Sequence, residues 1–345
     1  MLFRSNVGPN SAGADPGPVC YNKGGKNPTV TDADMVLGYI NPNFFLGGKK
    51  KLDKEAAVSA LKTMGKKLGM DEVEVSAGIY DIQNSHMVDL LRGLLIRRGY
   101  DPKEFALFAF GGGGPTHAAT YGSEIGVGSI YMFPESSVFS AFGIATADIQ
   151  QIYNKFDHYF MPADPARVST SFEELEKKAL KEMLRMNFKE KEIHLKRELE
   201  MKFGRQVHSE IMPIQSKRYT ENDIKKLGED FVVHYTNVYG EGGAFVEGGM
   251  EIMNLRVTAT VNVPTPQIEK HKLGSTDSKP AIKERRDVYW RKYNGFRMTS
   301  IYDYTKLDAG MIFDGPAVVE APTTTLVVLP GQSSKVDEFL NVVIS

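Results

Sequence analysis

The residues best suited to chemistry are four consecutive glycines, Gly111 to Gly114, followed by Pro115 and His117. A short apolar run, Phe105 to Phe110, precedes the glycines, and a helix-like segment follows Pro115. A loop between a strand and a helix lets a ligand approach backbone N–H groups that no helical carbonyl satisfies, and the helix dipole favours an anion there. The pattern predicts contact with a nucleotide, although a tight packing turn would use the same residues.

Other catalytic patterns are absent from the sequence. The loop is neither G-x-G-x-x-G nor a P-loop with its lysine and hydroxyl, which disfavours Rossmann and Walker sites, and no G-x-S-x-G nucleophile elbow occurs. The spacing of His194 and His208 is not that of metal ligands, so we assign no metal site. Two roles stay open for His117: a ligand or acid–base group, or a hydrogen-bonded packing residue. Asp32 is interpreted as a helix N-cap in preference to a phosphate or metal ligand.

Elements that would position the glycine loop follow from periodicity. Apolar residues recur at helical spacing from about residue 54 to 68 and from 73 to 95. The wholly apolar run before the glycines is expected to be a buried strand, and Ser129 to Phe133 a second one. Further helices are predicted over 172–186 and 223–238, and further strands over 193–203 and 251–261.

Composition limits the class of protein. The 345 residues are 41% hydrophobic and 25% charged, with a formal net charge of -1, so neither nucleic acid nor an anionic membrane is expected as a partner. A single cysteine, Cys20, excludes an internal disulfide and fits a cytoplasmic location. We find neither a signal peptide in the first 14 residues nor an apolar run long enough to span a membrane.

Domain boundaries are suggested by a polar, proline-rich stretch from Thr265 to Lys283, which is interpreted as a linker. Residues 161–270 are predicted to form an α+β domain before it. Residues 284–345 are predicted to form a small β-rich barrel or sandwich after it.

Several motifs together resemble the hydantoinase A/oxoprolinase family, in that family's order. They are Val7–Tyr21, Pro28–Ala33, Phe45–Gly48, Phe110–Ala118, Asn254–Val257, Gly315–Glu320 and Thr323–Thr325. This resemblance covers nearly the whole chain. It implies an α/β and α+β fold in which residues 1–160 are part of an actin/hexokinase-like (ribonuclease-H-like) lobe.

The resemblance also implies a site. The family's adenosine-side loop falls on Gly111, Gly112, Gly113, Gly114, Pro115 and His117, so these are the expected contacts to ATP. Its two D-x-G-G-T phosphate loops would precede Val7, and the chain begins almost there. We therefore expect a separate N-terminal-half hydantoinase A-like subunit to hold the phosphates and most ligands of Mg²⁺, and a hydantoinase B-like subunit to complete the complex.

The activity implied is activation of a carbonyl by phosphorylation. The chain is expected to be a subunit of an ATP-dependent ketone carboxylase of the acetophenone carboxylase type, a ligase that uses bicarbonate. It is expected to be inactive without its partner subunits. Two alternatives stay open: a subunit of an ATP-dependent cyclic amide hydrolase, and a catalytically silent scaffold. The sequence assigns no residue to the chemical step.

Overall fold

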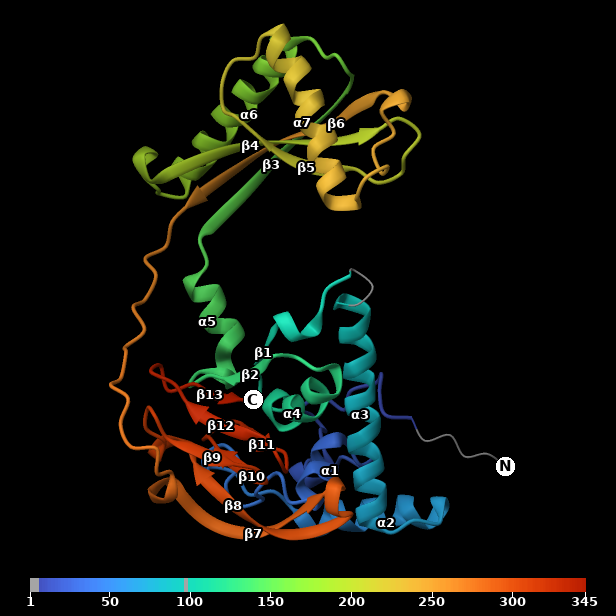
Figure 1. The fold of residues 1–345 in the computed structure, drawn as a ribbon, viewed down its shortest axis with the longest axis vertical. Coiled ribbons are helices and arrows are strands. Elements are labelled where there is room, and N and C mark those ends of the chain that lie inside the picture. The colour runs from blue at the N-terminus through green and yellow to red at the C-terminus, as the bar shows by residue number, and fades with distance from the viewer. Residues whose placement is uncertain (1–5, 96–98) are drawn as a thin grey trace. The chain divides into compact units, whose positions relative to one another are not determined.

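The computed structural model describes residues 6–95 and 99–345. It consists of two compact units, one formed by residues 1–143 together with Gln267–Ser345 and the other by Ile144–Pro266 (Figure 1). These units divide the chain at other positions than the three predicted domains, because strands from the C-terminal part pair with a strand near residue 130. The mixed α/β and α+β architecture is confirmed.

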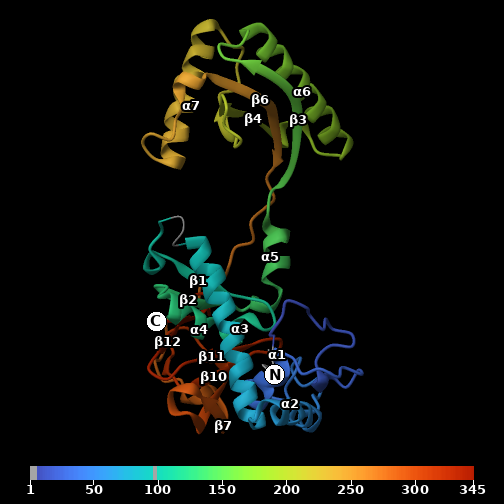
Figure 2. The same ribbon diagram turned by 90° about the vertical axis from the view of Figure 1, so that its right-hand side faces the viewer.

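The helices of the first unit are α1 (Val30–Val36), α2 (Lys54–Leu68), α3 (Glu72–Leu95) and α4 (Gly114–Ile125), and α5 (Phe139–Thr146) leads out of the unit. The two helices whose bounds the sequence predicts in the first unit, over 54–68 and 73–95, are present as α2 and α3. Asp53 caps α2 by accepting a hydrogen bond from the Ala56 N–H (2.9 Å), and Gly69 ends it in the left-handed region at φ 72°. Figures 1 and 2 show that α3 lies beside α1 and α4.

The cap of α1 differs in detail from the prediction. Thr29 is the N-cap residue, and Asp32 lies one turn inside the helix. The Asp32 carboxylate accepts hydrogen bonds from the N–H groups of Val19 (3.1 Å), Cys20 (2.8 Å) and Thr29 (2.8 Å). Asp32 therefore satisfies free amides as expected, but as the third helical residue of a capping box.

Two sheets complete the first unit. The five-stranded sheet has the order β1-β2-β13-β12-β9, and the four-stranded sheet has the order β11-β10-β8-β7. Their strands are β1 (Ala106–Ala109), β2 (Ser129–Met132), β7 (Ile282–Trp290), β8 (Gly295–Asp303), β9 (Ile312–Asp314), β10 (Ala317–Glu320), β11 (Thr325–Val328), β12 (Ser333–Val336) and β13 (Val342–Ile344). β1 and β2 are parallel, and β13 is antiparallel to β2.

The prediction of a fully buried strand before the glycines is wrong. β1 is an edge strand of its sheet. Phe108 in this strand is 50% exposed, and Phe110, just after it, is 46% exposed. An apolar run reports only the preference of its side chains for burial; whether burial occurs depends on what covers the sheet.

The second unit is an antiparallel sheet of order β3-β6-β4-β5 packed with two helices. Its elements are β3 (Ile149–Phe160), α6 (Pro165–Arg185), β4 (Ile193–Phe203), β5 (Glu210–Ile214), α7 (Glu221–Tyr239) and β6 (Met250–Val261). Phe172, Phe203 and Phe231 are fully buried in its core. Residues 262–275 contain neither helix nor strand. Within the described ranges, no helix is both long and apolar enough to cross a membrane.

Candidate functional site

The glycine loop connects the end of β1 to the start of α4. Gly111 turns the chain at φ 84°, a left-handed conformation that favours glycine, and its N–H donates to the Ser136 carbonyl oxygen (2.7 Å). Gly113 is the N-cap residue of α4, and no side chain caps this end of the helix. The helix therefore presents uncapped backbone amides at the loop.

The loop is open. A Cβ atom added at Gly111, Gly112, Gly113 or Gly114 would meet no atom within 4 Å. The N–H groups of Gly112 and Gly113 donate to no acceptor in the described part of the chain. The structure thus brings the predicted glycines together as an accessible surface of amides and not as a closed packing turn.

A threonine far away in the sequence holds the loop in place. The Thr324 hydroxyl lies 3.1 Å from both the Gly111 and the Gly112 carbonyl oxygens, and the Thr116 hydroxyl donates to the Thr325 carbonyl oxygen (3.0 Å). The carbonyl oxygens of Gly111 and Gly112 therefore both face the Thr324 hydroxyl, which donates its one proton to them. The Thr323–Thr325 motif was identified from the sequence. Its contact with the glycine loop was not, because Thr324 and Gly112 are 212 residues apart and no local pattern links them.

A small pocket that is open to solvent lies beside the loop. Three motifs of the sequence meet there: Gly112 with Thr116, the segment from Ile40 to Leu46, and the segment from Glu320 to Thr325. Phe44 and Phe45 contribute aromatic side chains to its wall. The pocket therefore joins a wall of both polar and apolar side chains to the edge of the glycine loop.

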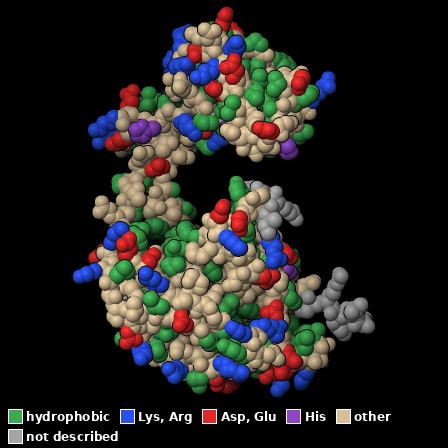
Figure 3. Space-filling model, in the orientation of Figure 1, with side chains coloured by type: hydrophobic (Ala, Val, Ile, Leu, Met, Phe, Trp, Pro, Cys, Tyr) green, Lys and Arg blue, Asp and Glu red, His purple; other side chains and the backbone are tan. Residues whose placement is uncertain are grey.

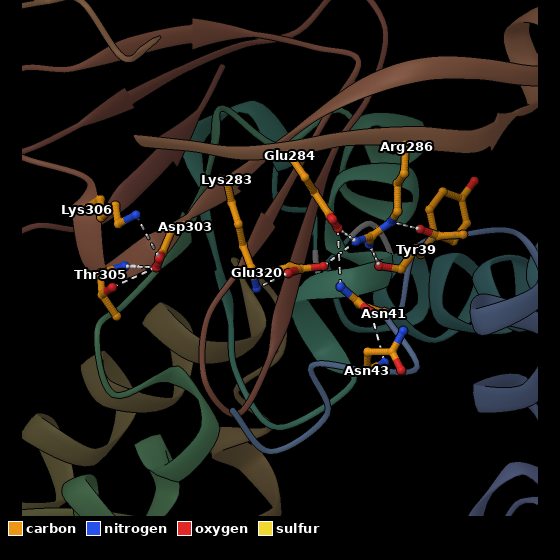
Figure 4. Close-up of polar contacts among 11 residues, drawn as sticks. Tyr39, Asn41, Asn43, Lys283, Glu284, Arg286, Asp303, Thr305, Lys306 and Glu320 are labelled. Atoms are coloured by element: carbon orange, nitrogen blue, oxygen red, sulfur yellow. Dashed lines mark hydrogen bonds and ion pairs between the residues drawn. The ribbon is translucent and has the colours of Figure 1, made fainter. Parts of the chain in front are cut away.

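The charge next to this pocket is balanced. Glu320 is buried and accepts from Lys283 (2.8 Å) and from Arg286, as Figure 4 shows. Arg286 also donates to the carbonyl oxygens of Gly38 and Tyr39 (3.1 Å each). This network ties β7 and β10 to the segment after α1, and it leaves no unpaired cation at the pocket wall among these residues.

His117 points into the protein interior. Its Nε2 lies 3.1 Å from the Asp34 carboxylate, its Nδ1 lies 3.3 Å from the Asn84 amide nitrogen, and its ring stacks on Tyr80 with 4.7 Å between centroids. All four side chains are buried. Both ring nitrogens are therefore engaged, Nδ1 by the Asn84 amide and Nε2 by the Asp34 carboxylate. A nucleotide contact by His117 stays a prediction and would require these bonds to break.

The partners of His117 were not found from the sequence. Asp34 and Asn84 lie 83 and 33 residues from it, and neither belongs to a pattern that predicts the pairing. Tyr80 also hydrogen-bonds Thr120 (2.8 Å), and burial raises its pKa above the ordinary value. These side chains join α1, α3 and α4 and thus support the helix that begins at the glycine loop.

Neither the cysteine nor a metal cluster adds a further reactive group. Cys20 is fully buried, and burial together with the nearby Asp32 raises the pKa of its thiol far above neutrality, so the thiolate is disfavoured. Across residues 6–95 and 99–345, no group of three His, Cys, Asp or Glu side chains is arranged to hold a metal ion.

The fold is a mixed α/β architecture with an open glycine loop at a helix start, a geometry that can accept an anion or the edge of a nucleotide. The Hydantoinase/oxoprolinase model matches residues 3–153, and the Hydantoinase/oxoprolinase C-terminal domain model matches residues 161–342. The chain belongs to the hydantoinase/oxoprolinase family, which confirms the resemblance found in the motifs.

Individual relatives are named as carboxylases and a caprolactamase. The gamma subunit of acetophenone carboxylase from Aromatoleum aromaticum is 34% identical, over 97% of this chain and 47% of its own length. A nucleotide-free structure of acetone carboxylase superposes with a TM-score of 0.84 at 29% identity, over 98% of this chain and 49% of that one. The ATP-dependent caprolactamase from Pseudomonas jessenii gives a TM-score of 0.79 at 26% identity, with the same coverage. The chain spans about half the length of these relatives.

Proposed function

We propose that the chain is part of an ATP-dependent ketone carboxylase of the acetophenone carboxylase type, in which its glycine loop contacts the nucleotide. The observation that carries the proposal is the open loop, whose Gly112 and Gly113 amides are free and whose carbonyls are held by Thr324. The names of the relatives, an acetophenone carboxylase subunit and an ATP-dependent acetone carboxylase, support the reaction class.

On this proposal, residues of this chain bind and position the nucleotide. The groups that carry out the chemical step lie on partner polypeptides. The amides of Gly112, Gly113 and Gly114 fit an electronegative edge of the adenosine part, because they are free donors beside the positive end of the α4 dipole. When bound, ATP supplies a phosphoryl group that turns a carbonyl or enol oxygen into a better leaving group. Pro115 fixes the first turn of α4 without requiring an acceptor for an N–H.

The remaining parts of the site are proposed to come from partner polypeptides. We assign the ligands of Mg²⁺ and the groups that hold the phosphates to an N-terminal-half hydantoinase A-like subunit, because the resemblance places the family's two phosphate loops before Val7. A hydantoinase B-like subunit, a ketone and bicarbonate complete the proposed system. On this proposal the chain is inactive alone and works in the cytoplasm.

A second function uses the same loop. The caprolactamase similarity favours an ATP-dependent hydrolase of a cyclic amide as the alternative. Incorporation of labelled bicarbonate into the product of the reconstituted complex separates the two, because only a carboxylase retains the label. Release of an amino acid without label would assign the hydrolase function.

The nucleotide contact is tested on the chain itself by saturation-transfer NMR with millimolar ATP, a method that detects weak binding. Gly112→Val and Gly113→Val add side chains into open space at positions that lack the left-handed conformation. We expect each to reduce the signal on the adenine protons at least tenfold, while the melting temperature stays the same. A scaffold with a silent site would show no ATP signal in the unchanged chain, or the same signal in both variants.

The matched control is Gly78→Ala. Gly78 lies on α3 in the same unit, also lacks the left-handed conformation and has no atom within 4 Å of an added Cβ. We expect its ATP signal to equal that of the unchanged chain. Loss of the signal in this control would mean that the Gly112 and Gly113 results do not report on the loop.

A further inference from the structure

A buried serine from the turn after β2 holds the chain on both sides of Phe110. Ser136 begins the short 3-10 helix that follows this turn, and its side chain is fully buried. Its hydroxyl donates to the Ala109 carbonyl oxygen (3.0 Å), and its own carbonyl oxygen accepts from the Gly111 N–H (2.7 Å). One residue therefore fixes the end of β1 through its side chain and the start of the glycine loop through its backbone.

The same hydroxyl also fixes the turn that carries it. The Phe133 N–H donates to the Ser136 Oγ (2.8 Å), and the Ser136 N–H donates to the Phe133 carbonyl oxygen (3.0 Å). The hydroxyl thus uses its one proton on β1 and accepts one bond from its own turn. Without it, the place of the Ser136 carbonyl oxygen relative to Gly111 would no longer be set by β1.

Burial of apolar side chains does not hold the loop at this point. Phe110, which lies between Ala109 and Gly111, remains half-exposed. Figure 3 shows hydrophobic side chains gathered at the surface over the place where Figure 1 labels β1 and β2. The position of the glycine loop therefore depends on hydrogen bonds more than on packing.

These hydrogen bonds decide where the free amides point. The Gly111 C=O shares a planar trans peptide with the Gly112 N–H, and the Gly112 C=O shares one with the Gly113 N–H. The N–H and C=O of a trans peptide point in opposite directions. Because Thr324 engages both carbonyls, both N–H groups are turned away from it. Ser136 fixes the peptide that precedes them through the Gly111 N–H.

The two attachments of the loop are connected to each other. The Ser137 hydroxyl lies 2.6 Å from the Thr323 hydroxyl, so the turn after β2 and the segment before β11 are joined beside the loop. We name Ser136, Ser137, Thr323 and Thr324 the loop bracket. The loop bracket engages one amide and two carbonyls of the glycine loop and leaves the next two amides free.

We propose that Ser136 is a positioning residue for the nucleotide contact. It acts through Ala109 and Gly111 and sets the direction of the loop, so that the N–H groups of Gly112 and Gly113 face the ligand together. Ser136 is itself buried and does not touch the ligand. The inference rests on the proposed function, because the contact that Ser136 supports is the proposed one.

The test compares Ser136→Ala with Ser76→Ala as a matched control. Ser76 is equally buried, and its hydroxyl donates to the Glu72 carbonyl oxygen within α3 (2.6 Å). We expect Ser136→Ala to speed hydrogen exchange of the Gly111 amide about tenfold and to reduce the ATP signal about fivefold, at a temperature where circular dichroism shows the chain folded. Ser76→Ala should leave both quantities within about twofold of the unchanged chain, although it too lowers the melting temperature.

A second variant serves if Ser136→Ala does not fold. Ser136→Cys keeps a side chain of similar size with a weaker donor, and we expect it to change both quantities in the same direction, each about threefold. A graded response from serine to cysteine to alanine would follow the strength of the hydrogen bond to β1.

Three results would overturn the proposal. The first is unchanged exchange of the Gly111 amide when Ser136 is replaced, and the second is faster exchange with an unchanged ATP signal. The third is an equal loss of the ATP signal in Ser76→Ala, which would reduce the effect to general destabilisation. Exchange of the Gly111 amide is measured without nucleotide, so it still decides whether Ser136 holds the loop if the unchanged chain gives no ATP signal and the proposed function fails.

Discussion

Replacement of His117 by alanine is expected to destabilise the first unit strongly. Among the described residues, His117 is the hydrogen-bond partner of Asp34 Oδ2, and the other carboxylate oxygen, Oδ1, has none. The substitution therefore leaves the carboxylate without a partner. Asp34 is 3% exposed, so its carboxylate depends on neighbouring side chains for its hydrogen bonds. His117 is thus expected to act mainly through stability.

The size of the effect follows from this burial. Leaving a buried carboxylate without its hydrogen-bond partner typically costs about 3–5 kcal/mol. A unit of this size loses about 2–4 °C of melting temperature per kcal/mol, so His117→Ala should lower the midpoint by roughly 6–20 °C. Loss of the stacking contact with Tyr80 acts in the same direction.

The single tryptophan of the chain provides the assay. Trp290 is buried in the first unit, where its indole N–H donates to the Thr299 hydroxyl (2.9 Å), so its fluorescence follows unfolding of that unit. The double variant Asp34→Ala with His117→Ala should recover at least about 2 kcal/mol relative to the sum of the single effects, because no carboxylate is then stranded. A loss below about 1 kcal/mol for His117→Ala, or strict additivity in the double variant, would contradict the reasoning.

Two further predictions concern other contacts. Thr324→Val removes the hydroxyl that holds the Gly111 and Gly112 carbonyls. We expect it to lower the free energy of unfolding by about 1 kcal/mol, measured on the Trp290 transition, and to reduce the ATP signal by a larger factor, whereas Thr324→Ser should be near normal in both. A normal ATP signal in Thr324→Val would refute a positioning role. In the second unit, Nε and Nη2 of the buried Arg197 each lie 2.7 Å from the Glu176 carboxylate. Glu176→Ala leaves this guanidinium without its carboxylate, so we expect it to lower the free energy of unfolding of the second unit by about 3 kcal/mol, measured by circular dichroism, while the Trp290 transition is unaffected. A shift of both transitions together would show that the pair does not act within its own unit.

Local signals in the sequence were sufficient for most elements. Asp53 and Gly69 delimit α2 because a cap acts on amides and carbonyls within one turn of itself. The order of strand, glycine loop and helix was also correct, because the conformational freedom of glycine and the helix start after Pro115 are properties of adjacent residues. The motifs together identified the family.

Other features depended on contacts between distant parts of the chain. The sequence did not show that β13 joins β2, that Thr324 holds the glycine loop, or that His117 meets Asp34 and Asn84. It also predicted a buried β1 where the structure has an exposed edge. Thus the sequence by itself determined most helices, the caps of α2, the glycine loop and the family. Only the tertiary structure decided which surfaces are covered and which side chains meet. Periodicity and capping act over a few residues, whereas burial and hydrogen bonding at the site depend on residues up to 213 positions apart in the sequence.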